Sequence, residues 1–140
     1  DELLVVAGDN FFSGSFRGIV DMGEKKRTPI VGIYDVGALE QVKFLNELVL
    51  EEDGMIKVFK EKPEMPKHTV SGIALYYYPA WTLPFISAYL KQGNNPDQPG
   101  RMIQWLHPKT PCYTWLFPGT WFDVGTHKSL EEAEAYLKNK

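Results

Sequence analysis

Two short apolar runs near the N-terminus have the pattern of buried strands. Leu3–Ala7 and Pro29–Val36 are almost continuously apolar, which is typical of strands covered on both faces in parallel α/β sheets. Between them, Gly8-Asp9-Asn10 indicates a turn, and apolar residues then recur at helical spacing from Phe12 to about Lys25. The order strand, helix, strand predicts a right-handed crossover and a parallel sheet.

A β-hairpin is expected in the middle of the chain. Asp53-Gly54 separates the stretches Glu47–Leu50 and Met55–Phe59, and Asp-Gly is a strong turn signal because glycine accepts a positive φ. The remaining segments predict a short helix over 38–45, a strand over 70–78, helices over 79–92 and 102–106, a strand over 112–117, a loop over 119–125 and a last helix over 129–137. The pattern therefore indicates one α/β unit with an inserted hairpin.

The composition excludes several classes of protein. Of the 140 residues, 44% are hydrophobic and 24% are charged, as in soluble globular proteins. The net charge is −3 without a basic cluster, and no apolar run reaches the roughly 20 residues that span a bilayer, so neither nucleic-acid nor membrane binding is expected. The single cysteine, Cys112, excludes an internal disulfide framework and suits the cytoplasm.

The N-terminus begins with Asp1 rather than methionine and leads almost directly into the first apolar run. Chain ends are normally loose and exposed, so a buried strand at this position is unusual. We therefore expect the chain to be a piece of a longer protein. Its first two strands would then lack neighbours, and the uncovered apolar surface predicts a homo-oligomer.

Asp9, which follows the first predicted strand, is the first candidate for chemistry. In open α/β sheets ligands bind at the carboxyl ends of the strands, where a carboxylate can hold a hard cation such as Mg²⁺. An Asp ahead of a helix can equally serve as its N-cap, and this position alone leaves both interpretations open.

A second candidate, Glu61-Lys62-Pro63, follows the hairpin. Pro63 fixes φ and ends the strand, Lys62 offers a compact positive charge for a phosphate, and Glu61 offers acceptors for sugar hydroxyls. Residues 57–67 are mostly charged, so the alternative is a solvated charge run.

Two glycine-containing segments complete the candidates. Val70-Ser71-Gly72 opens a strand with an internal glycine, which marks either a close backbone approach to a ligand or a bulge. In the segment 121–126 and the residues just before it, Gly119 and Gly125 bracket Trp121 and Asp123 in one loop. The alternatives there are a core role for Trp121 and capping of the last helix.

Taken in order, these segments resemble the nucleotidyltransferases that make nucleotide sugars from NTPs and sugar 1-phosphates. The matching segments are VVAGDNFF, KVFKEKPEMP after the Asp-Gly hairpin, VSGIALYYY and GTWFDVGTHKSLEEAEAYL. The GTH.SL form of the last segment looks closest to that of glucose-1-phosphate thymidylyltransferases. The resemblance extends from Leu4 to Leu137.

The resemblance implies a Rossmann-like α/β fold with a mostly parallel sheet and an inserted β-hairpin, incomplete relative to the full family fold. It implies that residues 1–140 are the C-terminal part of a nucleotidyltransferase domain, which binds the sugar phosphate and the metal. The family's G-x-G-T-R loop, which holds the NTP phosphates, has no match in this sequence. The chain alone is therefore expected to be inactive.

The resemblance also implies a catalytic metal site. Asp9 and Asp123 would hold Mg²⁺ from opposite ends of the sequence, which requires them to lie within roughly 8 Å of each other. Lys62 would hold the phosphate of the sugar 1-phosphate as the third catalytic residue.

Further residues are implied for the sugar pocket. Glu61, Val70 through its backbone, and Gly72 would shape the pocket, and Trp121 would form a wall near the metal. Leu45-Asn46 stands where the family often has an aromatic–glycine pair whose backbone amide meets the sugar, so Asn46 is a further substrate-binding candidate.

The implied reaction is attack of the sugar-phosphate oxygen on the α-phosphorus of an NTP, with release of pyrophosphate. Such chemistry needs positioning and charge neutralisation rather than a covalent nucleophile. Two alternatives remain open. One is a short non-catalytic relative that binds sugar phosphates or pairs with a partner subunit. The other is a nucleotide-sugar-dependent glycosyltransferase, which normally has a D-x-D metal motif that this sequence lacks.

Overall fold

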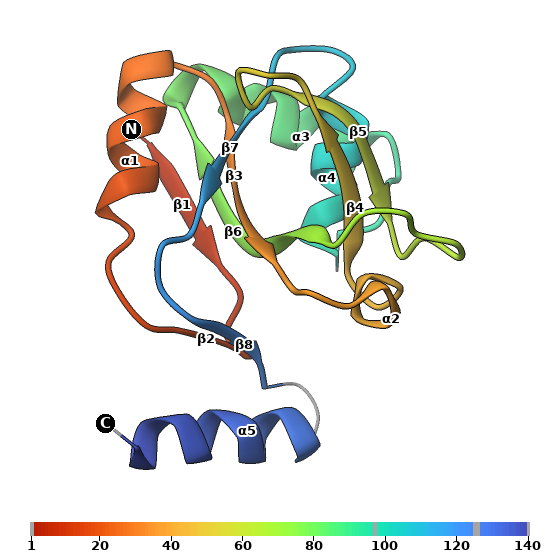
Figure 1. Ribbon diagram of the computed structural model, residues 1–140. Coiled ribbons are helices and arrows are strands. Elements are labelled where there is room, and N and C mark those ends of the chain that lie inside the picture. Colours follow the sequence, from red (N-terminus) through yellow and green to blue (C-terminus); the bar gives the residue numbers. More distant parts are fainter. Residues whose placement is uncertain (1, 97, 125–126, 140) are drawn as a thin grey trace.

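A four-stranded mixed sheet forms the centre of the computed structural model, which describes residues 2–96, 98–124 and 127–139. Its strands lie in the order β1-β6-β3-β7 (Figure 1). They are β1 at Leu3–Val6, β3 at Ile30–Asp35, β6 at Val70–Tyr78 and β7 at Tyr113–Leu116.

The directions of these strands only partly confirm the predicted parallel sheet. β3 and β7 are parallel neighbours, whereas β6 runs antiparallel to both β1 and β3. Strands β1 and β3 therefore share a direction, as their helical crossover predicts, but β6 inserts between them. The apolar run of β6 is buried on both faces, and such a run has the same composition in either direction.

Helices cover the two faces of the sheet. Figure 1 shows α1, Arg17–Lys26, on one side, and α3, Leu83–Lys91, with α4, Pro99–Leu106, on the other. A 3-10 turn η1, Ala80–Thr82, leads into α3, whose first turn tolerates Pro84 because an N–H at that position would have no helical partner.

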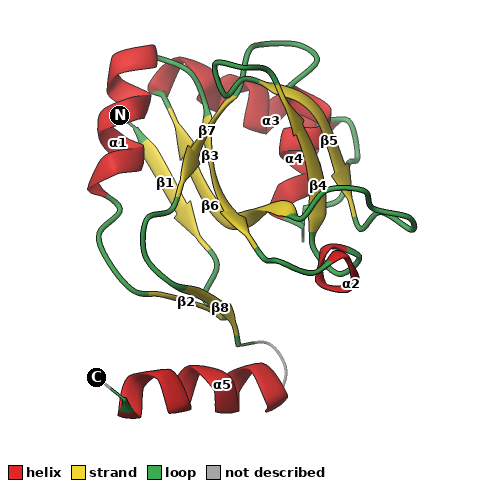
Figure 2. Cartoon of the chain, viewed as in Figure 1, coloured by secondary structure: helices red, strands yellow, loops and turns green. Residues whose placement is uncertain are grey.

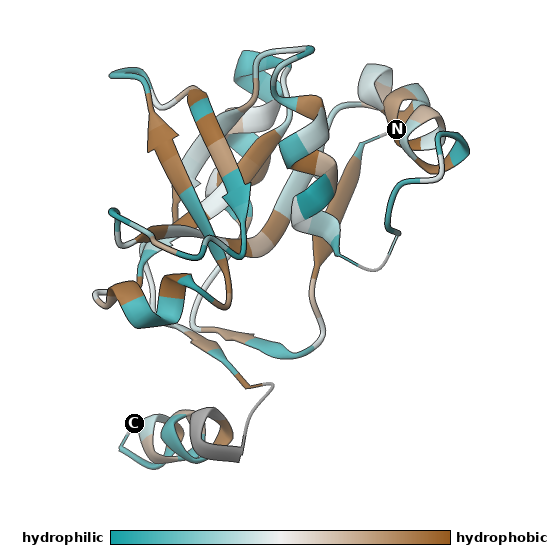
Figure 3. Ribbon diagram, turned by 90° about the vertical axis from the view of Figure 1, so that its right-hand side faces the viewer, coloured by the Kyte–Doolittle hydropathy of each residue, from teal (hydrophilic) through white to brown (hydrophobic). Residues whose placement is uncertain are grey.

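The tyrosine run of β6 divides between two hydrophobic clusters. Tyr76 and Tyr78 pack in the cluster that includes α3 and α4, whereas Tyr77 packs in the cluster that includes α1. This alternation follows from the two-residue period of a strand. Figure 2 shows the resulting helix–sheet–helix arrangement, and Figure 3 shows that the apolar residues concentrate on the strands while most turns are hydrophilic.

Strand β1 differs from the prediction of a strand covered on both faces. Leu3, Leu4 and Val6 are 38–39% exposed, because β1 is an edge strand with β6 as its only neighbour in the described part of the chain. Ile30–Ile33 of β3 is buried as predicted. The apolar composition of Leu3–Ala7 thus indicated a strand correctly but not its coverage.

The predicted hairpin is confirmed as β4, Asn46–Leu50, paired with β5, Ile56–Glu61. Gly54 has a φ of +88°, and the Asp53 carboxylate accepts a hydrogen bond of 3.1 Å from the Met55 N–H. The Asp-Gly signal therefore has the backbone geometry that it predicted. A short helix α2, Leu39–Val42, precedes the hairpin.

A two-stranded ribbon joins segments that the sequence assigned to a helix and to a loop. β2, Asn10–Phe12, pairs antiparallel with β8, Trp121–Asp123. Phe12 was predicted to begin the first helix, which starts instead at Arg17. Three-residue strands are too short to establish a period of two, so the aromatic spacing resembled a helix. Phe12 still packs as an apolar residue, with its ring 5.4 Å from that of Phe117.

The last helix, α5, His127–Lys138, lies below this ribbon in Figure 1. Tyr136 brings its ring to 6.0 Å from Phe11 and 5.5 Å from Phe122. The predicted helix over 129–137 is therefore confirmed. No helix in the described residues has the length and apolar character needed to cross a membrane.

Candidate active site

A cleft of about 400 Å³ lies between β6, the ends of the hairpin strands, the β2–β8 ribbon and the start of α4. The sequence candidates that line it are Asp9, Asn46, Glu61, Lys62, Gly72, Trp121 and Asp123. Val70 is the exception: it begins β6 opposite Asp35 and packs half-buried against the core cluster of α3 and α4. The structure thus brings together every candidate except Val70.

Of the two candidate metal ligands, Asp123 lies at the end of β8, and Asp9 immediately precedes its partner strand β2. Asp123 is opposite Asn10 in the β2–β8 register, and the Val124 N–H donates a 2.9 Å hydrogen bond to the main-chain oxygen of Asp9. Both residues line the cleft, while the approach of their carboxylates to within roughly 8 Å stays a prediction. Asp9 precedes strand β2 rather than a helix, so the alternative of an N-cap does not apply.

Oxygen donors of this kind fit Mg²⁺. Mg²⁺ usually binds through one or two carboxylates and completes its octahedron with water and phosphate oxygens. Asp9 and Asp123 both line the cleft, and within the described ranges no group of three His, Cys, Asp or Glu side chains is placed to hold a metal ion.

Trp121 combines the two roles that the sequence left open. It is 7% exposed and packs in the cluster beneath α1, yet it also lines the cleft. Its indole N–H donates a 2.7 Å hydrogen bond to Asn10 Oδ1, while Asn10 Nδ2 donates a 2.8 Å bond to Asp9 Oδ1. The ring therefore fixes an amide that in turn orients a candidate metal ligand.

Asn46 has a structural role that sequence reasoning missed. Its side-chain oxygen accepts a 2.7 Å hydrogen bond from the Gly72 N–H, and its amide group donates a 3.1 Å bond to the Gly72 carbonyl. The backbone N–H that was considered for a sugar contact donates to Ser71 Oγ at 3.3 Å. Asn46 thus joins β4 to β6. The sequence features that could have indicated this role are an asparagine at the start of one apolar strand and a glycine inside another.

Lys62 occupies a strained backbone position at the edge of the cleft. Its φ is +47°, a region that costs a non-glycine residue about 1–2 kcal/mol, and its N–H donates a 2.9 Å bond to the Leu45 carbonyl. Pro63 beside it is fully buried, whereas Lys60 is exposed on the strand. The charged segment is therefore not uniformly solvated, because Glu61 is half-buried and Pro63 is buried, whereas Lys62 lines the cleft at a solvent-exposed position.

Glu61 presents a partly desolvated carboxylate. Burial raises the pKa of Glu61, and the nearby charges of Arg101 and Lys62 oppose that increase. Its Oε2 atom is buried without a hydrogen-bond partner among the described residues, and its main-chain N–H donates a 2.8 Å bond to Gln104 Oε1. An unpaired buried acceptor is costly, which makes this carboxylate ready to accept a ligand hydroxyl.

Gly100 at the start of α4 provides the space for this carboxylate. A Cβ atom at Gly100 would overlap Glu61 Oε2, a conflict that only a shift of the flexible Glu61 side chain relieves. The sequence pattern predicted no helix or strand between the helices expected over 79–92 and 102–106, so this contact was missed. No local pattern indicates it, because the two residues come from different elements.

Gly100→Ala is expected to displace the Glu61 carboxylate toward solvent and to lower its pKa toward the ordinary value, because burial is the main cause of the increase. The pKa can be measured from the Glu61 side-chain carbon shift in an NMR titration. Gly8→Ala is the matched control, since a Cβ there meets nothing within 4 Å. An unchanged Glu61 pKa in Gly100→Ala would contradict this packing.

Comparison with known sequences assigns the chain to a family. A model of the nucleotidyl transferase family matches residues 1–140. Glucose-1-phosphate adenylyltransferase of Bacillus subtilis (strain 168) is 30% identical over 142 residues, covering 96% of this chain and 36% of that protein. The corresponding enzyme of Clostridium acetobutylicum is 27% identical over 142 residues, with the same coverage of 96% and 36%. The chain therefore spans about a third of the length of these relatives.

Solved structures share the fold. A protein assigned as glucose-1-phosphate thymidylyltransferase from Bacillus anthracis, in complex with sucrose, has a TM-score of 0.81 and 22% identity, covering 100% of this chain and 56% of that one. A UDP-glucose pyrophosphorylase complexed with UDP-glucose has a TM-score of 0.78 and 21% identity, with coverage of 99% and 57%. Since the family model matches the whole length and the fold agrees, the chain belongs to the nucleotidyl transferase family.

Proposed function

We propose that this chain is the sugar-phosphate and metal-binding part of an enzyme that transfers a nucleotidyl group from an NTP to a sugar 1-phosphate. The observation that supports this most directly is the cleft itself, which is lined by a lysine, a partly desolvated carboxylate, two further carboxylates at the β2–β8 ribbon and a buried tryptophan. The names of the relatives, glucose-1-phosphate adenylyltransferases, agree with a glucose 1-phosphate substrate.

Each residue has a distinct role in this proposal. The Lys62 ammonium group binds the phosphate of the sugar 1-phosphate, and the Glu61 carboxylate accepts a hydrogen bond from a sugar hydroxyl. Gly72 lines the cleft while its backbone holds Asn46, and Trp121 forms the wall behind the sugar. Val70 contributes to the pocket only indirectly, through the position of β6.

Asp9 and Asp123 hold Mg²⁺, which neutralises negative charge on the reacting phosphates when it is bound. The sugar-phosphate oxygen attacks the α-phosphorus of the NTP and pyrophosphate leaves. The chain's residues contribute by orienting the sugar phosphate and by excluding water from one side of it. The NTP phosphates are expected to bind largely outside residues 1–140.

Isothermal titration of the chain with glucose 1-phosphate tests this proposal. We expect Mg²⁺-dependent binding with a Kd of roughly 1 mM, because a half-site lacks the preorganisation needed for tighter binding. We also expect no pyrophosphate release with glucose 1-phosphate, Mg²⁺ and any common NTP or dTTP. A folded chain that does not bind glucose 1-phosphate would contradict the proposed function. Rapid turnover would show that the chain is a complete enzyme instead.

We also propose that the chain associates through the exposed edge of β1. Leu3, Leu4 and Val6 present apolar side chains beside an edge of β1 that no described strand pairs with, and such edges favour association. Sedimentation velocity is expected to show a dimer or larger oligomer. Leu4→Lys should shift the population toward monomer, and a wild-type chain that stays monomeric at high concentration would refute the association. A cytoplasmic location is part of the same proposal and agrees with a single buried thiol, Cys112.

A further inference from the structure

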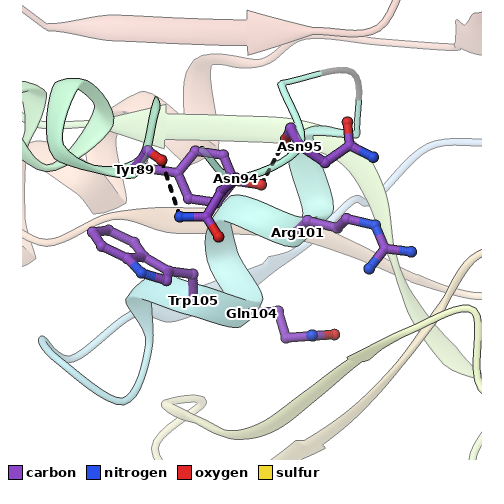
Figure 4. Close-up of a pocket in the computed structure, with 6 residues that line it drawn as sticks. All are labelled: Tyr89, Asn94, Asn95, Arg101, Gln104 and Trp105. Atoms are coloured by element: carbon purple, nitrogen blue, oxygen red, sulfur yellow. Dashed lines mark hydrogen bonds between the residues drawn. The ribbon is translucent and has the colours of Figure 1, made fainter. Parts of the chain in front are cut away.

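A second cavity, of about 340 Å³, lies next to the cleft along helix α4. Gln98, Pro99 and Gly100 line the cleft, whereas the next turn of the helix faces the second cavity. The residues that line the second cavity are Tyr89, Asn94, Asn95, Arg101, Gln104 and Trp105 (Figure 4). Its volume is at the small end of the range for ligand sites, about 300–1,000 Å³.

One end of this cavity is held in place by hydrogen bonds. The Tyr89 hydroxyl donates a 2.6 Å bond to the Asn95 carbonyl, and Asn94 Nδ2 donates a 2.9 Å bond to the Tyr89 carbonyl (Figure 4). The Tyr89 ring also meets the Trp105 ring edge-on at 5.5 Å. Two aromatic rings and the loop after α3 therefore make up one wall of the cavity, and hydrogen bonds hold this wall in place.

Cationic and amide side chains form the rest of the lining of the second cavity. Arg101 donates through Nε to Gln98 Oε1, which leaves its two terminal nitrogens directed elsewhere. No carboxylate in the described part of the chain lies within ion-pair distance of Arg101. In Figure 4 the guanidinium group lies between the amides of Asn95 and Gln104. A guanidinium group flanked by amides is suited to an oxyanion that also carries hydroxyls.

We propose that this second cavity binds a small hydroxylated anion, with one phosphate or carboxylate group on Arg101 and hydroxyls on the amides of Asn94 and Gln104. The Trp105 ring supplies an apolar face for the carbon skeleton of the ligand. A guanidinium group binds either oxyanion through two parallel hydrogen bonds, so the two chemistries share one site. The proposal goes beyond nucleotidyl transfer, because none of these residues lines the cleft.

A ligand in the second cavity would affect Glu61 in the cleft through two side chains. Gln104 lines the second cavity while its Oε1 accepts the Glu61 N–H, and Arg101 holds down the pKa of Glu61 by its charge. An anion on Arg101 would offset that charge, so the pKa of Glu61 should increase when the cavity is filled. The second site is therefore expected to alter the carboxylate that faces the sugar pocket.

NMR titrations of the 140-residue chain distinguish the two cavities, because each contains one tryptophan. The indole N–H of Trp105 reports on the second cavity and that of Trp121 on the cleft. The probes are glucose 6-phosphate, gluconate and inorganic phosphate. The first two compare a phosphate with a carboxylate on a hydroxylated ligand, and inorganic phosphate shows how much of the affinity the sugar hydroxyls contribute. We expect a saturable shift of the Trp105 signal, with the two hydroxylated anions binding more tightly than inorganic phosphate.

Arg101→Met is expected to weaken this binding at least about tenfold, and Arg101→Lys to restore part of it. Arg17→Met, at an exposed arginine on α1, is the matched control and should have no effect. Gln104→Ala, at an exposed position, provides a second test should Arg101→Met fail to fold.

A Trp105 signal that does not saturate by about 10 mM, or shifts confined to Trp121, would overturn the second site. Equal binding by Arg101→Met would do the same. A Glu61 pKa that stays constant while the Trp105 signal saturates would refute the link to the cleft.

Discussion

Asn46→Ala is expected to lower the free energy of unfolding by about 3 kcal/mol. The substitution removes both hydrogen bonds to Gly72 and leaves the buried Gly72 N–H without an acceptor, at about 1–3 kcal/mol, while the Gly72 carbonyl keeps only the 3.2 Å bond from Ser71 Oγ. Asn46 is 5% exposed, so water cannot replace the lost partners without opening the join between β4 and β6. Urea denaturation followed by tryptophan fluorescence measures the change.

Two comparisons make this result specific to the Asn46 amide. Asn46→Asp keeps the acceptor for the Gly72 N–H but loses the donor, so it should fall between wild type and Asn46→Ala. Asn94→Ala removes one hydrogen bond from a half-buried amide and should cost about 1 kcal/mol or less. If Asn46→Ala were no less stable than Asn94→Ala, the Asn46 side chain would not be what joins the hairpin to the sheet.

Lys62→Ala is expected to weaken glucose 1-phosphate binding at least about tenfold, and to bring it below detection by calorimetry. A charge-assisted hydrogen bond to a phosphate contributes about 1.5–3 kcal/mol, which is a large part of the affinity of a millimolar site. Stability should change little, because alanine adopts the same positive φ at a similar cost.

Lys60→Ala is the matched control, since Lys60 lies two residues earlier, is exposed and does not line the cleft. It should bind glucose 1-phosphate like the wild type. Equal losses in the two variants would indicate that only the net charge of the segment matters, and the assignment of Lys62 to the sugar phosphate would fail.

Local signals predicted the parts of the fold that depend on neighbouring residues. The Asp53-Gly54 turn, the strand over 70–78 and the last helix are where the sequence indicates, because turn chemistry and periodicity are properties of a few adjacent residues. The candidate site residues were indicated by order and family resemblance rather than by any single motif. The structure gathers all but Val70 of them at one cleft.

The features that sequence reasoning missed depend on contacts between distant residues. The direction of β6 depends on its two neighbours, which its own composition does not specify. The role of Asn46 depends on Gly72, and the space beside Gly100 depends on Glu61. Each pair comes from separate elements, so neither member has a recognisable pattern alone.

The β2–β8 ribbon has a consequence for the synthesis of the protein. All four strands of the central sheet are complete when residue 116 has been made, whereas β8 and its Asp123 come later. Domains begin to fold while the ribosome is still adding residues, and pairings between distant segments form last. The nascent chain can therefore build its sheet while Asp9 still lacks its partner strand. Premature termination after β7 would yield a sheet-containing product without the carboxylate pair, so a folded chain is not by itself evidence of an assembled metal site.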